Sequence, residues 1–233
     1  MIIHQLKSIS EFCLDLLFPK RCVQCGEFGA FVCHKCLAKI KPIQTQVCPK
    51  CGKISDRGKW CSGCKGKSNL SGMIVAADYR TGPTKELIHH LKYNSILELS
   101  PVLADLLIDQ LIDLDFRGEI IMTSVPLHRR RFNERGFNQA EILAKRTAKN
   151  IGYDYQNLLI RKKYSDSQVK SSGRKRRENL IGAFDLAKLA SAKKKTVILI
   201  DDVSTTGTTL EECAKVLRAS GARQVWGLVV ARG

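Results

Sequence analysis

The residues with the clearest capacity for chemistry lie in the segment 196–212. An apolar run is followed by two adjacent carboxylates, Asp201 and Asp202, and then by a short loop rich in hydroxyl groups. Backbone N–H groups at such a loop and at the start of the next helix suit a phosphate, because the helix dipole favours an anion there. The carboxylates would repel a phosphate, so we expect them to accept hydrogen bonds from vicinal ribose hydroxyls. The loop residues are Ser204, Thr205, Thr206, Gly207, Thr208 and Thr209.

The same segment has a simpler interpretation, an ordinary strand–turn–helix whose aspartates and threonines only cap the helix. It contains neither the Gly-Lys-Ser/Thr of a Walker A loop nor the G-x-G-x-x-G of a dinucleotide site. Two adjacent acids at the end of a buried strand, followed by four threonines around Gly207, favour a site for a phosphorylated ribose.

Eight of the ten cysteines form four Cys-x-x-Cys pairs near the N-terminus. Two such pairs supply four thiolates, which complete a tetrahedral zinc site. We expect two structural zinc ions, one on the first two pairs and one on the last two, while the spacing also permits an interleaved pairing. Disulfides, a redox pair and iron–sulfur ligation are less favoured by the regular spacing and by a reducing compartment. The ligands are Cys22, Cys25, Cys33, Cys36, Cys48, Cys51, Cys61 and Cys64.

Basic residues gather in two further segments. Arg129, Arg130 and Arg131 follow the end of an expected strand, where open α/β sheets bind ligands, so they face either a pyrophosphate or nucleic-acid phosphates. A second group suits a lid over the phosphate site or a track for a nucleic-acid backbone. It consists of Arg161, Arg174, Lys175, Arg176 and Arg177. Aromatic residues are few, and Trp60, Phe132, Phe137 and Tyr164 are expected to pack in the interior rather than to stack on bases.

These residues must be positioned by an α/β fold, because strands and helices alternate from Met73 onward, which predicts a parallel sheet with crossover helices. Strands are expected at 73–79, 119–125, 196–200 and 224–231. Helices are expected at 83–93, after Ser100 as an N-cap, and at 136–150 and 210–219. The stretch between residues 150 and 196 is polar and long, which is typical of a functional or disordered loop. The domains expected are an N-terminal amphipathic helix (1–20), a Cys-rich region (21–68) and the α/β domain (73–233).

The composition adds a bias toward anionic partners. There are 39 basic and 22 acidic residues, a formal net charge of +17, with enough hydrophobic residues for a globular fold. The N-terminal helix is interrupted by Lys7, Glu11 and Asp15, so it is neither a signal peptide nor a membrane span. We therefore expect a cytoplasmic protein that is not an integral membrane protein, with association at a membrane surface as the less favoured alternative.

Segment 196–212 resembles the phosphoribosyl pyrophosphate (PRPP) motif of type I phosphoribosyltransferases, in which two acids hold the ribose hydroxyls and the Thr/Gly loop holds the 5-phosphate. Further motifs follow in order: Leu17-Phe-Pro, Leu91-Lys-Tyr, Val125-Pro-Leu-His and Arg135-Gly-Phe-Asn-Gln. Together with the cysteines they resemble the ComF competence family over nearly the full chain. The resemblance implies a double zinc ribbon ahead of a phosphoribosyltransferase-like domain, and a link to natural transformation, in which DNA enters the cytosol as a single strand.

On this resemblance Asp201 and Asp202 hold the ribose and residues 204–209 hold the 5-phosphate. A pyrophosphate needs positive charge and usually Mg²⁺, for which Lys92 and Arg135 are the candidate protein cations. The implied function is a PRPP-binding protein that handles single-stranded DNA, with other DNA-uptake proteins as partners. Two alternatives stay open: a metabolic phosphoribosyltransferase with an unidentified acceptor base, and a zinc-dependent nucleic-acid binder that senses PRPP. No catalytic residue is assigned, because no placed general base and no base-reading segment stand out.

Overall fold

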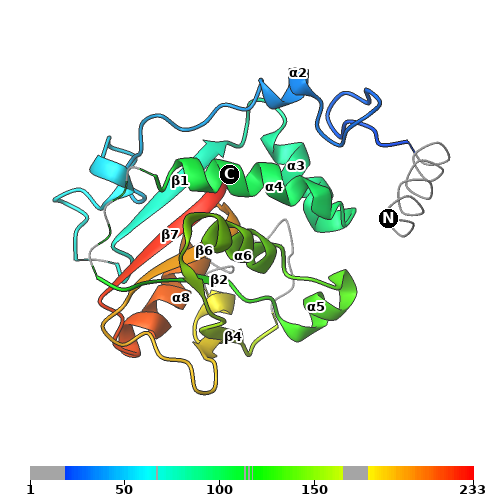
Figure 1. Cartoon of the computed structure of the whole chain (residues 1–233). Coiled ribbons are helices and arrows are strands. Elements are labelled where there is room, and N and C mark those ends of the chain that lie inside the picture. Colours follow the sequence, from blue (N-terminus) through cyan, green and yellow to red (C-terminus); the bar gives the residue numbers. More distant parts are fainter. Residues whose placement is uncertain (1–18, 67, 113, 115, 117, 165–177) are drawn as a thin grey trace.

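The computed structural model describes residues 19–66, 68–112, 114, 116, 118–164 and 178–233. It shows an α/β domain with the Cys-rich region lying along one edge of its sheet (Figure 1). The expected N-terminal helix lies outside the described residues except for its last two positions, and so do Arg174, Lys175, Arg176 and Arg177. Within the described part, no helix is long and apolar enough to cross a bilayer.

The sheet consists of parallel strands, as the alternation of elements predicts. Its order is β1 (Gly72–Asp78), β7 (Gln224–Arg232), β6 (Thr196–Ser204), β2 (Ile120–Ser124) and β3 (Asp154–Tyr155). Strands β6 and β7 are buried over most of their length, because both faces of a parallel sheet are covered. The central position of β6 places its carboxyl end between the ends of β7 and β2.

Helices cover both faces of this sheet. The first face carries α3 (Thr84–Tyr93), α4 (Ser100–Asp109) and α6 (Gln139–Ile151), which pack on Ile198 and Ile200 of β6. The second face carries α8 (Thr208–Ala219), which packs on Val197 and Leu199. The two sets of β6 residues alternate because successive side chains of a strand point to opposite faces.

The Cys-rich region contains only short elements among its described residues, α2 (His34–Leu37) and the 3₁₀ helix η1 (Asp56–Gly58). It runs beside β1 in Figure 1 and satisfies the free edge of that strand. The Ile43 amide donates to the Ala76 carbonyl at 2.9 Å and the Asp78 amide donates to the Lys41 carbonyl at 3.0 Å. The Gln46 side chain adds two more bonds, donating to the Val75 carbonyl and accepting from the Val75 amide. An otherwise exposed strand edge is thereby covered.

Several local predictions differ from the structure. Ser100 is not an N-cap: it has helical φ −63° and ψ −32°, because the 3₁₀ turn η2 (Leu97–Leu99) runs directly into α4. The helix expected at 136–150 is α6, which begins at Gln139, and it is preceded by a helix that was not expected, α5 (Arg129–Arg135). This helix ends on Gly136 at φ 81°, and Asn138 caps α6.

The long polar stretch also holds structure that the sequence did not predict. Besides β3 it contains β4 (Leu159–Arg161) and β5 (Phe184–Leu186), which pair antiparallel in a small second sheet. These strands are only two or three residues long, so they carry no readable alternation of polar and apolar residues. At the site itself, β6 continues to Ser204 and α8 starts at Thr208, so both acids belong to the strand.

Candidate functional site

The two adjacent carboxylates lie at the carboxyl edge of the sheet, close to the end of the central strand. Asp201 is half-buried, and Asp202 is buried with its side chain 3% exposed. One oxygen of each carboxylate accepts a hydrogen bond from the next backbone amide: Asp202 N to Asp201 Oδ1 at 2.9 Å, and Val203 N to Asp202 Oδ1 at 2.6 Å. These local bonds fix both side chains and leave one oxygen of each for another partner.

For Asp202 that partner is the ammonium of Lys92, whose Nζ lies 2.8 Å from Asp202 Oδ2. Lys92 sits in the last turn of α3 and is 20% exposed, so the pair is largely withdrawn from water. Burial lowers the pKa of Lys92, but the attraction of Asp202 outweighs it and raises that pKa. Burial and the negative charge of Asp202 raise the pKa of Asp201 to about 8, against the opposing effect of Lys92. The structure thus brings one predicted cation to the two predicted acids.

The hydroxyl-rich loop joins β6 to α8. Gly207 has φ 76° and precedes the first residue of α8, a left-handed conformation that glycine adopts without strain. Thr206 Oγ1 and Thr208 Oγ1 are 2.8 Å apart, and the Gly233 amide donates to the Ser204 carbonyl at 3.0 Å. The first turn of α8 therefore opens its amides toward a loop of hydroxyl groups, which is an arrangement that suits a phosphate.

Arg135, the second predicted cation, reaches the same end of α3. Its guanidinium lies 5.3 Å from the centre of the Tyr93 ring and donates to Gln139 Oε1. Tyr93 directly follows Lys92, so the separated Leu91-Lys-Tyr and Arg135-Gly-Phe motifs meet in space. His128 has a structural role: its Nδ1 accepts from the Arg130 amide and caps α5.

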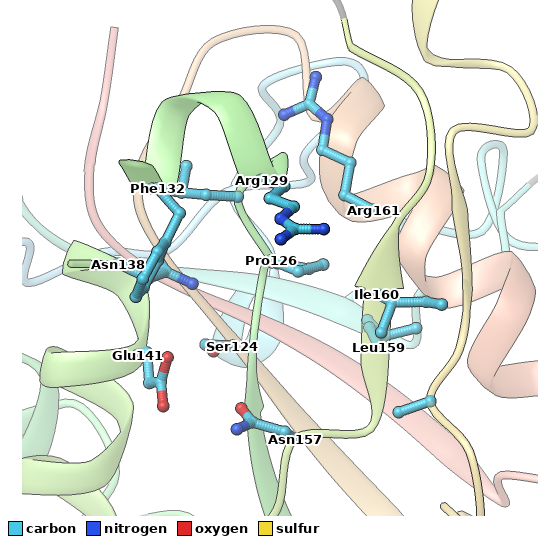
Figure 2. A pocket seen from close by; sticks show the side chains of 12 residues that line it. Ser124, Pro126, Arg129, Phe132, Asn138, Glu141, Asn157, Leu159, Ile160 and Arg161 are labelled. Atoms are coloured by element: carbon cyan, nitrogen blue, oxygen red, sulfur yellow. The ribbon is translucent and has the colours of Figure 1, made fainter. Parts of the chain in front are cut away.

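The consecutive arginines of α5 have different surroundings. Arg130 pairs with Glu134 at 3.1 Å and its guanidinium lies 4.8 Å from the Tyr164 ring centre. Arg129 instead lines a pocket of about 360 Å³ together with Arg161, and Figure 2 shows both guanidiniums at one end of it. Phe132, expected to be interior, is 44% exposed and lines this pocket too. Neither Asp201, Asp202 nor any residue of the Thr/Gly loop lines this pocket, so the pocket is separate from the carboxylate site.

The Thr/Gly loop also borders a second cavity, of about 310 Å³, whose other wall comes from the Cys-rich region. Lys50 and Trp60 line it opposite Thr206, Gly207 and Thr208. Two contacts hold these walls in place: Arg232 Nη2 donates to the Pro49 carbonyl at 2.7 Å, and Glu211 of α8 accepts from the Asn69 amide at 2.7 Å. No sequence signal identifies Lys50, because its position depends on how two separate regions dock.

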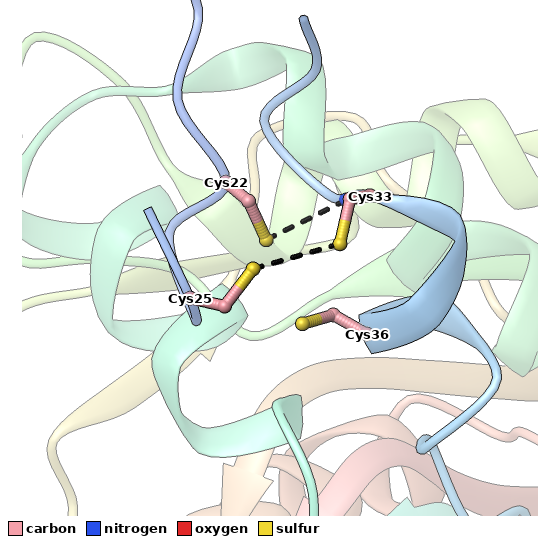
Figure 3. Close-up of side chains that lie close together, drawn as sticks. All are labelled: Cys22, Cys25, Cys33 and Cys36. Atoms are coloured by element: carbon pink, nitrogen blue, oxygen red, sulfur yellow. Dashed lines mark hydrogen bonds between the residues drawn. The ribbon is translucent and has the colours of Figure 1, made fainter. Parts of the chain in front are cut away.

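The cysteines form two clusters, and both use consecutive pairs. Cluster 1 joins Cys22, Cys25, Cys33 and Cys36 (Figure 3), and cluster 2 joins Cys48, Cys51, Cys61 and Cys64. In each cluster the sulfur atoms all lie within 4.8 Å of one another. The expected pairing is therefore confirmed and the interleaved alternative is excluded.

The sulfur geometry fits zinc rather than disulfides. Sγ of Cys25 lies 3.6 Å from Sγ of Cys33, and Sγ of Cys51 lies 3.5 Å from Sγ of Cys61. Four sulfurs bound to a tetrahedral zinc at about 2.3 Å would be roughly 3.8 Å apart, whereas a disulfide needs about 2.05 Å. Burial raises the pKa of Cys22, but backbone amides of Cys33, Cys25 and Gln24 outweigh it and lower that pKa to about 6, so a thiolate is available for a metal.

Comparisons with known proteins agree with both halves of this description. Residues 13–65 match the double zinc ribbon domain and residues 136–232 match the phosphoribosyl transferase domain. Competence protein F of Haemophilus influenzae is 31% identical over 225 residues, which cover 91% of this chain and 97% of that protein.

Two further relatives match over most of their length. The DNA utilization protein YhgH of Salmonella typhi is 31% identical over 84% of this chain and 89% of its own. Competence protein ComFC of Bacillus subtilis is 28% identical over 82% of this chain and 79% of its own. The chain therefore belongs to the ComF family of competence and DNA utilization proteins, which carry a double zinc ribbon ahead of a phosphoribosyltransferase domain.

Proposed function

We propose that this protein binds PRPP with Mg²⁺ at the carboxyl end of β6 and handles single-stranded DNA during DNA uptake. The observation that carries the proposal is the end of β6 itself. It places two carboxylates beside a hydroxyl-rich loop and the N-terminus of α8, with the ammonium of Lys92 held 2.8 Å from Asp202. Acceptors for ribose hydroxyls thus adjoin donors for a phosphate.

In this proposal each group has a distinct task. Asp201 and Asp202 accept hydrogen bonds from the ribose hydroxyls, while the loop residues 205–209 and the first amides of α8 hold the 5-phosphate. Mg²⁺ is held by the pyrophosphate oxygens and by a carboxylate, since this ion takes oxygen ligands from phosphates and one or two acids. Asp201 fits that need, because only one of its oxygens accepts from a backbone amide. Lys92 forms an ion pair with Asp202, and its ammonium carries three N–H donors from which the pyrophosphate can accept, with Arg135 nearby.

The DNA half of the proposal is supported by charge and by kinship. The net charge is +17, and Arg129 of α5 lines the same pocket as Arg161 of β4. Such a surface binds phosphates without reading sequence, and that binding weakens as salt rises. The names of the relatives, competence protein and DNA utilization protein, place those proteins in the handling of DNA.

The first experiment measures PRPP·Mg²⁺ binding by calorimetry for the wild type, Asp201→Asn and the control Asp154→Asn, which removes an exposed carboxylate from β3. We expect binding by the wild type and the control, and a loss of at least about tenfold in Asp201→Asn, which keeps one acceptor oxygen but loses its charge. Equal affinities for all three proteins would show that Asp201 does not take part in PRPP binding.

The second experiment measures single-stranded DNA affinity across a salt series, with and without PRPP·Mg²⁺. Steep weakening with salt supports the proposal, and a change on adding PRPP shows that the two sites are coupled. Salt-independent or absent binding at low salt overturns the DNA half. Pyrophosphate release in the presence of one nucleobase from a panel would instead favour the metabolic transferase.

A further inference from the structure

The pocket beside α5 combines features that the PRPP proposal does not use. It lies between the start of α6 and β4, below α5, and its volume of about 360 Å³ falls within the roughly 300–1,000 Å³ of small-molecule sites. Its side walls are apolar: Pro126 and Phe132 on one side, Leu159 and Ile160 on the other. Figure 2 shows two arginines at one end, and a serine, a glutamate and an asparagine at the other.

The polar end is organised by a chain of three side chains. The Tyr155 hydroxyl donates to Asn157 Oδ1 and lies 3.0 Å from Ser124 Oγ. Burial raises the pKa of Tyr155 to about 12, so its single proton stays in place and goes to Asn157. Because the Asn157 oxygen is thereby occupied, its NH₂ group is turned away from Tyr155, and no described residue accepts from it. Asn157 therefore offers two N–H donors at the end of an apolar slot.

The opposite end carries the positive charge. Arg129 has no carboxylate partner among the described residues, because the nearby acid of α5, Glu134, is held by Arg130. Arg161 donates through Nε to the Lys163 carbonyl, and Figure 2 shows its guanidinium at the same pocket end as that of Arg129. Glu141, the one acid among the residues that line the pocket, is paired with a lysine of α6 at 2.6 Å, so it does not cancel the arginines.

We propose that this pocket binds one nucleotide unit, with the base between the apolar walls, its polar edge on Asn157, and its phosphate on Arg129 and Arg161. A mostly apolar pocket with a hydrogen-bonding end suits a base, and two guanidiniums suit a phosphate. The inference deepens the proposed function and rests on its DNA half, because it names the pocket that would hold one base of the bound DNA strand. A free mononucleotide has the same chemistry.

The test compares Asn157→Asp with the control Gln156→Glu. The carboxylate introduced by Asn157→Asp would keep the oxygen that accepts from Tyr155 but replace the two donors with a second acceptor. Gln156 is the exposed neighbour and does not line the pocket, and its change to glutamate adds the same negative charge. Anisotropy is measured with a thymidine oligonucleotide and with an abasic oligomer of equal length, and competition is measured with each free deoxynucleoside monophosphate.

We expect the wild type and Gln156→Glu to prefer the thymidine oligomer over the abasic one, and Asn157→Asp to lose roughly tenfold on thymidine and little on the abasic strand. Arg129→Gln should weaken both oligomers alike, because it touches the phosphate. A third outcome would assign the pocket to free nucleotides. In that case a free mononucleotide competes with the wild type but not with Asn157→Asp, and neither oligomer is preferred over the other.

Equal binding of the two oligomers, together with no competition by mononucleotides, overturns the pocket while the proposed DNA handling stands. If neither oligomer nor any mononucleotide binds, the pocket and the DNA half of the proposed function fall together, whereas PRPP binding is untouched. A thermal unfolding midpoint for each variant that matches the wild type excludes misfolding as the cause.

Discussion

The ion pair between Lys92 and Asp202 provides a sharp test of how the carboxylates are held. In Lys92→Met the methionine preserves the apolar stem, but Asp202, whose side chain is 3% exposed, loses its counter-charge. Breaking a buried pair from one side costs about 3–5 kcal/mol. Because Lys92 itself remains 20% exposed, we expect the low end, about 3 kcal/mol at pH 8. This lowers Tm by roughly 6–12 °C for a chain of this size.

The sign of the pH dependence follows from Asp201. Its pKa is raised to about 8 in the folded protein, above about 3.9 in the unfolded chain. Between pH values of about 3.9 and about 8, the folded state therefore binds a proton that the unfolded chain does not. The free energy of unfolding falls as pH rises through this range. Lys92 opposes the rise, so removing it raises the pKa of Asp201 further and extends the fall of stability to higher pH. The part of the loss in Lys92→Met that comes from Asp201 should thus be near zero at pH 5 and should grow as pH rises through about 8, in addition to the cost of leaving Asp202 without its counter-charge.

The assay is urea unfolding of the zinc-loaded protein at pH 5, 6, 7, 8 and 9. Lys145→Met is the control. Lys145 forms an i,i+4 pair with Glu141 at 2.6 Å and its Nζ lies 5.5 Å from the centre of the Tyr155 ring, so its loss should cost about 1 kcal/mol at any pH. A loss in Lys92→Met that is equal at pH 5 and pH 9 would refute the coupling between Lys92 and Asp201.

Three further outcomes follow from the same structure. Cys48→Ser should lower the zinc content from two ions to one and weaken PRPP binding more than Cys22→Ser does, measured by elemental analysis and calorimetry, because only cluster 2 adjoins the Thr/Gly loop. Gly207→Ala should lower the free energy of unfolding by about 1 kcal/mol in urea, because its φ of 76° strains any side chain although a Cβ would meet nothing within 4 Å. PRPP affinity should rise with pH toward about 8, because ribose hydroxyls donate to ionised Asp201, and Asp201→Asn should abolish that slope.

The sequence predicts those parts of the molecule that depend on local pattern. The alternation of strands and helices predicted the parallel sheet. The apolar run 197–200 predicted a buried strand, because a strand that is covered on both faces is apolar throughout. The Cys-x-x-Cys spacing likewise predicts both clusters, since each pair needs only a tight turn. Short elements were missed: β4 and β5 are three residues each, and at that length tertiary contacts rather than propensity decide the conformation.

Contacts between distant segments could not be predicted. Lys92 was selected as a cation for a pyrophosphate, but its partner Asp202 lies far along the chain and depends on how α3 packs beside β6. The orientation of Asn157 depends on a tyrosine in β3 and a serine in β2, two strands that are neighbours only in the folded sheet. Contacts of this kind depend on which strands and helices are neighbours in the fold, so no spacing in the sequence predicts them.

The docking of cluster 2 gives the zinc a role beyond holding its own turn. Lys50 lies between the ligands Cys48 and Cys51, so a metal on these thiolates fixes the segment that lines the cavity beside Thr206. The carbonyl that precedes Lys50 accepts from Arg232 at the end of β7, which ties the turn to the carboxyl edge of the sheet. A zinc ion in cluster 2 therefore sets the position of a positive charge next to the proposed phosphate loop. Cluster 1 differs, because the residues between its ligands pack against the core on the α3 and α4 face, so its metal should contribute to stability and not to ligand affinity.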